Sequence, residues 1–281
     1  MPQHGVSQAD ILYEIETEGG ITRCLAIYGD VSQADVIGPV RSARTYFSNI
    51  AVSYDAPLVH CGGSRAALAA RYDSGSDKIS NWAHMDQASN GAYFYRDSAR
   101  KSQGYATEHT LFTTGEKLLQ GLTAKNYNTV TENSTDFGLT FDSEVSLNGA
   151  AANTINVNFL GKKTTTMTYN SSTGLYEAAQ YGKEYVDGNS GEVVSFKNVM
   201  ILYTKQQKIS DGKYYRSYYN LTGSGEGLLA IDGKIVPINW SREGLRTDFV
   251  YTLTDGTPLT LAEGHTYIAV ASTSSAPATY S

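Results

Sequence analysis

The feature that most constrains the fold is a change in the spacing of apolar residues along the chain. Before about residue 125, short apolar runs such as residues 11–15 alternate with helix-like stretches such as residues 42–54. From Ile155 onwards, apolar and polar residues alternate one by one, and Asp-Gly turn signals such as Asp211-Gly212 and Asp232-Gly233 separate the runs. The first pattern predicts an α/β layer with a mixed sheet, and the second predicts a mostly antiparallel β region.

The chain is therefore expected to be an α+β protein of two domains, and its 281 residues are enough for both. We expect an N-terminal α/β domain over residues 1–125, truncated at its start, and a β-rich C-terminal domain over residues 153–275. Residues 126–152 are rich in Asn, Thr and Ser and show no sustained helical period, so they are predicted to be a linker or insertion.

Charge and composition exclude several kinds of partner. A formal net charge of −6 argues against nucleic-acid or membrane binding by bulk electrostatics, and no apolar run reaches the roughly 20 residues that span a bilayer. The histidines are dispersed and no Cys/His spacing suits a metal, so we expect no metal and no cofactor. Cys24 and Cys61 lie in strand-like runs, where a disulfide is geometrically allowed but two buried thiols are favoured. No signal peptide is visible, which fits a cytoplasmic protein or a trimmed N-terminus.

Seven of the ten arginines lie in the first hundred residues, and Arg41 and Arg44 flank a predicted strand-to-helix junction. Ser42 is the expected N-cap of that helix, whose exposed amides and guanidinium neighbours favour an anion. The alternative is that Arg41 and Arg44 pair with Glu14, Glu16 or Glu18 of a nearby strand.

A second junction combines Gly62, Gly63 and Ser64 between a strand and an Ala-rich helix. The glycines lack a Cβ atom and so permit close approach of a ligand to the backbone. The run matches neither the nucleotide-binding glycine fingerprints nor the nucleophile elbow. Ser64 is therefore predicted to be an N-cap rather than a nucleophile.

Two further sets are candidates for catalysis or binding. Arg96, Arg100 and His109 lie in a weakly periodic segment that either binds an anion and supplies an acid or base, or is a solvated connector. Glu14 is a candidate base, alone or with a second carboxylate, although a salt bridge is the favoured interpretation.

Several ordered landmarks resemble the YerB-like family of bacterial lipoproteins. They include Ala9-Asp10-Ile11-x-Tyr13-Glu14, Ile37-Gly-Pro-Val-Arg-Ser-Ala-Arg44, His60-x-Gly62-Gly63-Ser64, Arg96, Arg100 and His109. Met1 and Thr110 depart from the family pattern. The resemblance covers nearly the whole chain and implies an extracytoplasmic, membrane-anchored protein of unassigned function with N- and C-terminal domains. It also implies that a lipobox signal precedes Met1, so that membrane contact is through a lipid anchor.

The preferred hypothesis is a cell-envelope protein that binds an anionic glycan, phosphate or peptide in a crevice of the N-terminal domain. The crevice residues are expected to be Arg23, Arg41, Ser42, Arg44, Gly62, Gly63, Ser64, Arg96 and Arg100. One alternative is a hydrolase or transferase of envelope polymers that uses His109 or Glu14 as its base. Another is an interaction scaffold that docks partners through its tyrosine-rich β half.

Overall fold

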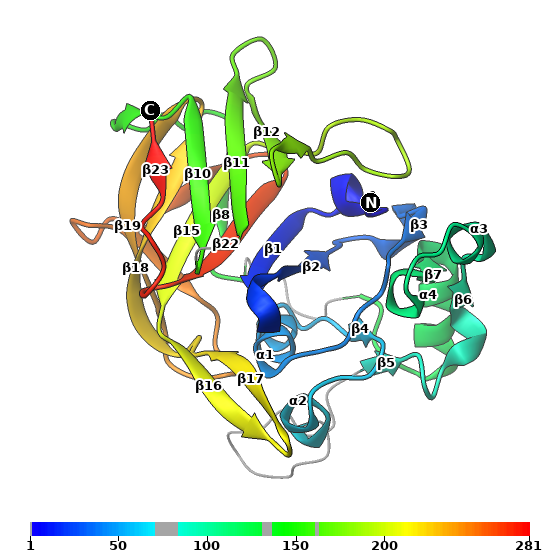
Figure 1. The fold of residues 1–281 in the computed structure, drawn as a ribbon. Helices are drawn as coiled ribbons and strands as arrows, with labels where there is room; N and C mark the ends of the chain where they lie inside the picture. Colours follow the sequence, from blue (N-terminus) through cyan, green and yellow to red (C-terminus); the bar gives the residue numbers. More distant parts are fainter. Residues whose placement is uncertain (1, 71–83, 131–136, 161–162) are drawn as a thin grey trace.

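A large mixed sheet forms the centre of the protein (Figure 1). The computed structural model describes residues 2–70, 84–130, 137–160 and 163–281. Met1 and the end of the Ala-rich helix, which is predicted at Tyr72, lie outside the described residues. In sheet order the strands are β2 (Thr22–Ile27), β1 (Ile11–Glu16), β22 (Thr266–Ser272), β15 (Asn198–Thr204), β18 (Gly223–Ile231), β19 (Lys234–Arg242) and β20 (Val250–Leu253), with β9 (Ala150–Ala151) beside β19.

One sheet thus contains strands from both ends of the chain. β1 runs parallel to β22, with Tyr13 opposite Ile268, and β22 in turn runs parallel to β15. Both faces of β1 are buried, which explains why Ile11, Leu12 and Tyr13 are apolar on successive positions. The predicted division into two domains stays a prediction, but hydrogen bonds of this sheet join the two halves of the chain.

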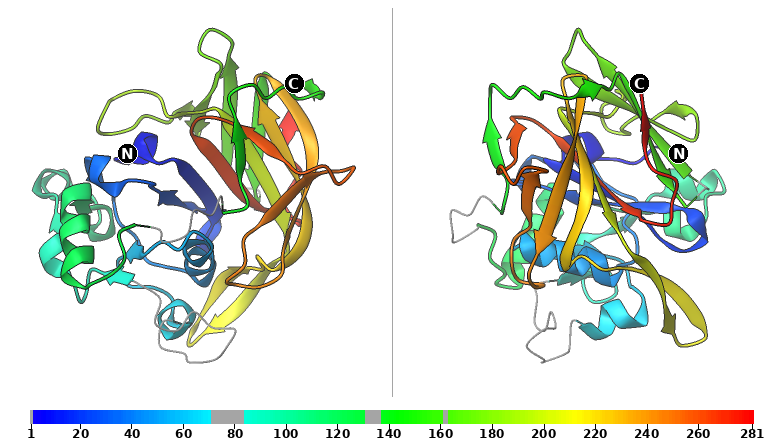
Figure 2. Two further views of the ribbon diagram at one scale, coloured as in Figure 1. Left: turned by 180° about the vertical axis from the view of Figure 1, so that it is seen from behind. Right: turned by 90° about the vertical axis from the view of Figure 1, so that its left-hand side faces the viewer.

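A second, antiparallel sheet packs on one face of the large sheet (Figures 1 and 2). Alternate residues of β10, such as Ile155 and Val157, enter the core between the sheets with Leu12 of β1. Its strands in order are β13 (Lys183–Glu184), β12 (Leu175–Gln180), β11 (Lys163–Asn170), β10 (Thr154–Phe159) and β23 (Thr279–Tyr280), with β14 (Ser195–Phe196) beside β12.

The opposite face of the large sheet is covered by α1 (Thr45–Ser53), whose Tyr46 and Ile50 pack in one core with Tyr13 of β1. The other helices are α2 (Arg65–Ala70), α3 (Ser98–Ser102) and α4 (Gly115–Ala124). Single turns of 3₁₀ helix cover Val6–Gln8, Glu18–Gly20, Val31–Gln33, Gly91–Tyr93 and Thr107–His109. Among the residues described, no helix is long and apolar enough to cross a bilayer.

Small sheets complete the molecule. One has three strands, in the order β3 (Val36–Ile37), β7 (Leu111–Thr114) and β6 (Tyr95–Arg96). Two are parallel pairs, β4 (Leu58–His60) with β5 (His84–Asp86) and β8 (Thr140–Asp142) with β21 (Thr260–Ala262). The last is the hairpin of β16 (Gln206–Asp211) and β17 (Tyr214–Tyr219). The mixed N-terminal strands, the helices and the antiparallel C-terminal strands confirm the predicted α+β class. The predicted Asp-Gly turns at residues 211–212 and 232–233 join hairpins as expected.

Candidate anion-binding site

Two of the predicted arginines lie close together without a carboxylate partner. Arg23 Nη1 donates to the carbonyl of Ser42 at 2.6 Å, and Arg41 Nη1 lies 2.9 Å from His109 Nδ1. Within the described part of the chain, no carboxylate comes within 4.0 Å of either guanidinium. Burial, with the positive charges of Arg44 and Arg41 acting in the same direction, lowers the pKa of Arg23 to about 10. Arg23 and Arg41 are therefore near enough to repel each other, and the crevice predicted around them stays a prediction.

His109 is held as a neutral acceptor in this cluster. Burial and the charge of Arg41 lower its pKa, against the opposing charge of Glu108. The neutral ring presents Nδ1 as the acceptor for the Arg41 guanidinium. His109 thus stabilises the position of Arg41, and the base role considered for it stays a prediction.

Arg44 pairs with a carboxylate. Such a pair was one of the two alternatives predicted for Arg44, the other being anion binding. Arg44 is buried, and its Nη2 lies 2.6 Å from Glu18 Oε2. The prediction that Ser42 caps the following helix is wrong, because the helix begins at Thr45 and the cap position falls on Arg44, which makes no side-chain cap. The reason is that the chain before the helix stays extended, and Ala43 pairs with Gly63 in a β-bridge.

The junction at residues 62–64 is held mainly by bonds within the protein. The Gly62 amide donates to Asp86 Oδ1 at 2.9 Å, and the Ser64 amide donates to the Ala43 carbonyl at 3.2 Å. Gly62 adopts φ 63°, in the left-handed region that glycine favours. Ser64 is confirmed as an N-cap, since its Oγ accepts from the Ala67 amide at 3.2 Å. The amides of Gly62 and Ser64 are thus not free for an anion.

The remaining arginines of the predicted set brace the chain around residues 95–112. Arg100 is buried and donates to the Pro2 carbonyl at 2.6 Å, with its guanidinium 4.7 Å from the centre of the Phe112 ring. Arg96 is exposed and donates to the Thr107 carbonyl at 2.5 Å. These contacts fit the connector interpretation of the segment better than a ligand site.

Glu14 lies apart from the arginines, on the face of β1 toward the second sheet. Its carboxylate is fully buried, forms an ion pair with Lys163, and accepts from Tyr267 Oη at 2.7 Å and Thr165 Oγ1 at 2.9 Å. Burial alone raises the pKa of Glu14, but the Lys163 ammonium and these hydrogen bonds outweigh it and hold the pKa below its ordinary value. The favoured salt-bridge interpretation holds, with a lysine in place of an arginine.

Both cysteines are free thiols. Burial raises the pKa of the Cys24 thiol to about 12, with the Glu14 carboxylate acting in the same direction. Burial also raises the pKa of the half-buried Cys61 thiol. Neither thiol is therefore primed for reaction as a thiolate at neutral pH.

A cavity of about 320 Å³ lies where the start of α2 meets the tip of the β16–β17 hairpin, and we call it the hairpin cavity. Figure 1 shows this hairpin extending from the sheet toward α2. The cavity is lined by Gly63, Arg65, Asp211, Lys213, Tyr214 and Arg216. Only Gly63 belongs to the site predicted from the sequence. The other five were missed, although Arg65 stands directly after the predicted glycine junction.

Three cations surround the hairpin cavity, and its own carboxylate is already bonded. Asp211 is buried, and its Oδ2 accepts from Arg216 Nε at 3.1 Å. Lys213 Nζ and Arg216 Cζ lie 5.2 and 5.3 Å from the centre of the Tyr214 ring, which is 53% exposed. Arg65 and Lys213 are exposed and carry no ion pair in the described residues. The cavity is therefore electropositive with one accessible aromatic face.

Glu18 connects the hairpin cavity to Arg44, because it forms ion pairs with both Arg44 and Arg216. Its Oε2 lies 2.6 Å from Arg44 Nη2 and 3.5 Å from Arg216 Nη1. Gly212 lets the hairpin turn approach Arg65, because a Cβ atom there would lie 2.7 Å from Arg65 Nη1 and the backbone has φ 73°. The positive φ thus favours glycine at this turn, whose backbone contacts the flexible end of the Arg65 side chain.

This fold and surface define a class of protein: a two-part α+β chain whose halves share one sheet and carry an electropositive cavity at their junction. Two family models match it, the N-terminal domain of "Protein of unknown function (DUF3048)" over residues 1–128 and its C-terminal domain over residues 155–268. The chain belongs to this family, as the YerB-like landmarks indicated.

One relative, "Putative lipoprotein YerB" of Bacillus subtilis (strain 168), is 27% identical over 271 residues, which cover 95% of this chain and 76% of the relative. The crystal structure of YerB protein from Bacillus subtilis superposes with a TM-score of 0.80 at 26% identity, covering 96% of this chain and 85% of that one. These likenesses support the fold and the family, while the relative's description assigns no activity.

Proposed function

We propose that the protein binds an anionic glycan of the cell envelope, with a phosphate or carboxylate group of the ligand held in the hairpin cavity. The observation that carries the proposal is the gathering of Arg65, Lys213 and Arg216 around one cavity whose carboxylate is already bonded. The net charge of the chain is −6, so this positive site is local rather than a general property of the surface. A local cluster attracts a specific anion without favouring every polyanion.

The chemistry of the lining suits a charged sugar. The Arg65 fork donates paired hydrogen bonds to a phosphate or carboxylate, and Lys213 adds a mobile point charge. The exposed Tyr214 ring offers an apolar face next to these donors. A ligand that combines an acidic group with a sugar ring uses all three.

The proposed location of the protein is supported by its relative rather than by the cavity. The relative from Bacillus subtilis is described as a lipoprotein, and the proposal extends this to an extracytoplasmic position with a lipid anchor. Envelope polymers that carry phosphate or carboxylate groups are the anions available in that position. Arg23 and Arg41, which have no carboxylate within 4.0 Å among the described residues, add further positive charge to the N-terminal half.

The test compares two double variants that remove the same charge. Arg65→Ala/Lys213→Ala takes two exposed cations from the cavity, and Lys205→Ala/Lys208→Ala takes two exposed cations from nearby positions outside it. A glycerol-phosphate oligomer titrated by calorimetry is expected to bind the first variant roughly 10- to 100-fold more weakly than the parent protein, since charge-assisted hydrogen bonds are lost. The second variant is expected to bind within about twofold of the parent.

Two results would contradict the proposal: absence of saturable binding by the parent protein, or an equal loss of affinity in both double variants. Equal loss would mean that the oligomer senses only overall charge. A neutral dextran serves as the control ligand and is expected to show no difference between the two variants.

A further inference from the structure

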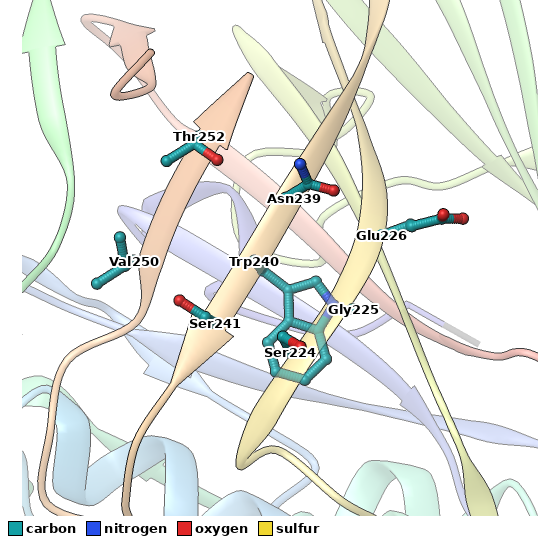
Figure 3. A pocket seen from close by; sticks show the side chains of 8 residues that line it. All are labelled: Ser224, Gly225, Glu226, Asn239, Trp240, Ser241, Val250 and Thr252. Carbon is teal, nitrogen blue, oxygen red and sulfur yellow. The ribbon is translucent and has the colours of Figure 1, made fainter. Parts of the chain in front are cut away.

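A second hollow lies on the face of β18, β19 and β20, away from the hairpin cavity (Figure 3). Its volume is about 300 Å³. Leu228 of β18 packs in the core between this sheet and the second sheet. Glu226 lies two residues before Leu228, on the same face of β18, and is exposed. The hollow therefore occupies the part of this face that the second sheet leaves uncovered.

The side chains of the hollow form a regular grid, because three neighbouring strands are in register. One row consists of Ser224, Ser241 and Val250, and the next row consists of Glu226, Asn239 and Thr252. Strands in a sheet are about 4.8 Å apart and alternate residues on one strand are about 6.6 Å apart. Five polar side chains are thus presented at fixed spacings on a rigid support (Figure 3).

None of these five polar side chains has a hydrogen-bond partner within the described residues. Asn239, Ser241 and Thr252 are nevertheless partly buried, so their surroundings restrict the water that reaches them. Asn239 and Thr252 stand directly opposite each other on adjacent strands. Their hydrogen-bonding groups remain available on the open side of the sheet.

The second sheet provides an internal comparison with the same residue types. On β10 and β11, Asn156 Oδ1 accepts from Thr166 Oγ1 at 2.8 Å, and Asn158 Oδ1 accepts from Thr164 Oγ1 at 3.1 Å. Both are pairs of directly opposite residues. Cross-strand Asn and Thr therefore bond to each other elsewhere in this protein, which makes the free set on β18–β20 distinctive.

We infer that this face binds an uncharged, hydroxyl-rich ligand of the class of a neutral oligosaccharide. Hydroxyl and amide groups both donate to and accept from sugar hydroxyls, and a carboxylate accepts from them. Glu226 is the one charged residue of the grid, so an anion is disfavoured here. A peptide added as a further strand is also disfavoured, because residues beyond β20 already bond to it, with the Leu253 amide donating to the Thr257 carbonyl at 2.8 Å.

The test uses a tetramer of N-acetylglucosamine titrated into the full chain by calorimetry. Asn239→Ala/Thr252→Ala removes two free side chains of the grid, and Asn156→Ala/Thr166→Ala removes the same residue types from the second sheet. The first variant is expected to bind the tetramer roughly 10-fold more weakly, the usual effect of losing two neutral hydrogen bonds. The control variant is expected to bind as the parent does. Thermal unfolding checks that both variants remain folded.

A second variant, Ser241→Tyr, fills the hollow from its exposed side and is expected to abolish tetramer binding. Absence of saturable tetramer binding by the parent protein would overturn the inference, and so would an equal loss in the grid and control variants. Weakened tetramer binding by Arg65→Ala/Lys213→Ala would also overturn it, by placing the ligand in the hairpin cavity. The inference is independent of the proposed anionic ligand. Asn239→Ala/Thr252→Ala is expected to leave the binding of that anionic ligand unchanged.

Discussion

The protein contains two clusters in which cations lie near a carboxylate, and the clusters differ in burial and in pairing. In the first, Glu14 and Lys163 are both buried between the two sheets and bond to each other. In the second, Arg65 and Lys213 stand exposed at the hairpin cavity beside a single buried aspartate. A fully paired, buried cluster stabilises one arrangement of strands, whereas unpaired cations at a cavity contribute little to folding and remain available to a ligand. Charge alone therefore does not mark the functional surface of this chain.

The strongest way to break this comparison is to remove one charge from the buried cluster. Glu14→Gln leaves the Lys163 ammonium buried without its carboxylate, and we expect a loss of about 3–5 kcal/mol in the free energy of unfolding. The double variant Glu14→Gln/Lys163→Met removes both charges and is expected to lose less than the single variant. Denaturant unfolding measures both. A loss below about 1 kcal/mol in Glu14→Gln would show that the pair is not a structural element.

Acid provides a second and smaller test of the same cluster. Because the folded protein holds the pKa of Glu14 below its ordinary value, the ionised form contributes stability that is complete above the unfolded pKa of about 4.3. This stability is lost as the pH falls through the folded pKa. We expect the free energy of unfolding to decline below about pH 4.3 more steeply in the parent than in Glu14→Gln. Parallel pH profiles would contradict the assignment.

The smallest expected effect lies at the hairpin cavity. Arg65→Ala/Lys213→Ala is expected to change the free energy of unfolding by no more than about 0.5 kcal/mol, because neither exposed side chain forms an ion pair with the described residues. Denaturant unfolding in low and high salt measures this change. A destabilisation comparable to that of Glu14→Gln would mean that these cations brace the hairpin, and the contrast between the two clusters would disappear.

Local signals were sufficient for several elements of the fold. Ser64 caps its helix as predicted, since an N-cap bond joins residues only three apart. The turn at Asp232-Gly233 forms the predicted hairpin, because both residues adopt the left-handed backbone that such a turn requires. The pairing of Arg44 with Glu18 was among the alternatives, although the choice between them was not available from spacing.

The candidate site was predicted only in part. Arg23 and Arg41 lie near each other, and their place in a binding crevice stays a prediction. Ser42 does not cap a helix, and Arg100 bonds to the Pro2 carbonyl of the N-terminal segment. The tyrosine-rich β half, which contains Tyr214, was considered as a docking surface, yet nothing in its spacing linked it to Arg65. The Ala66 amide donates to Asp211 between α2 and the β16–β17 hairpin, and these two residues are 145 positions apart.

By itself, the sequence determined the class of fold, the family, the Ser64 cap and the Asp-Gly turns. These depend on residue periodicity and on interactions between neighbours in the chain, which a reader of the sequence sees directly. Only the tertiary structure decided which charges are neutralised and which remain available. Burial and pairing depend on segments brought together from distant positions, as β1 is brought to β22 and α2 to the β16–β17 hairpin, and the energy of a charge depends on those surroundings more than on its own identity.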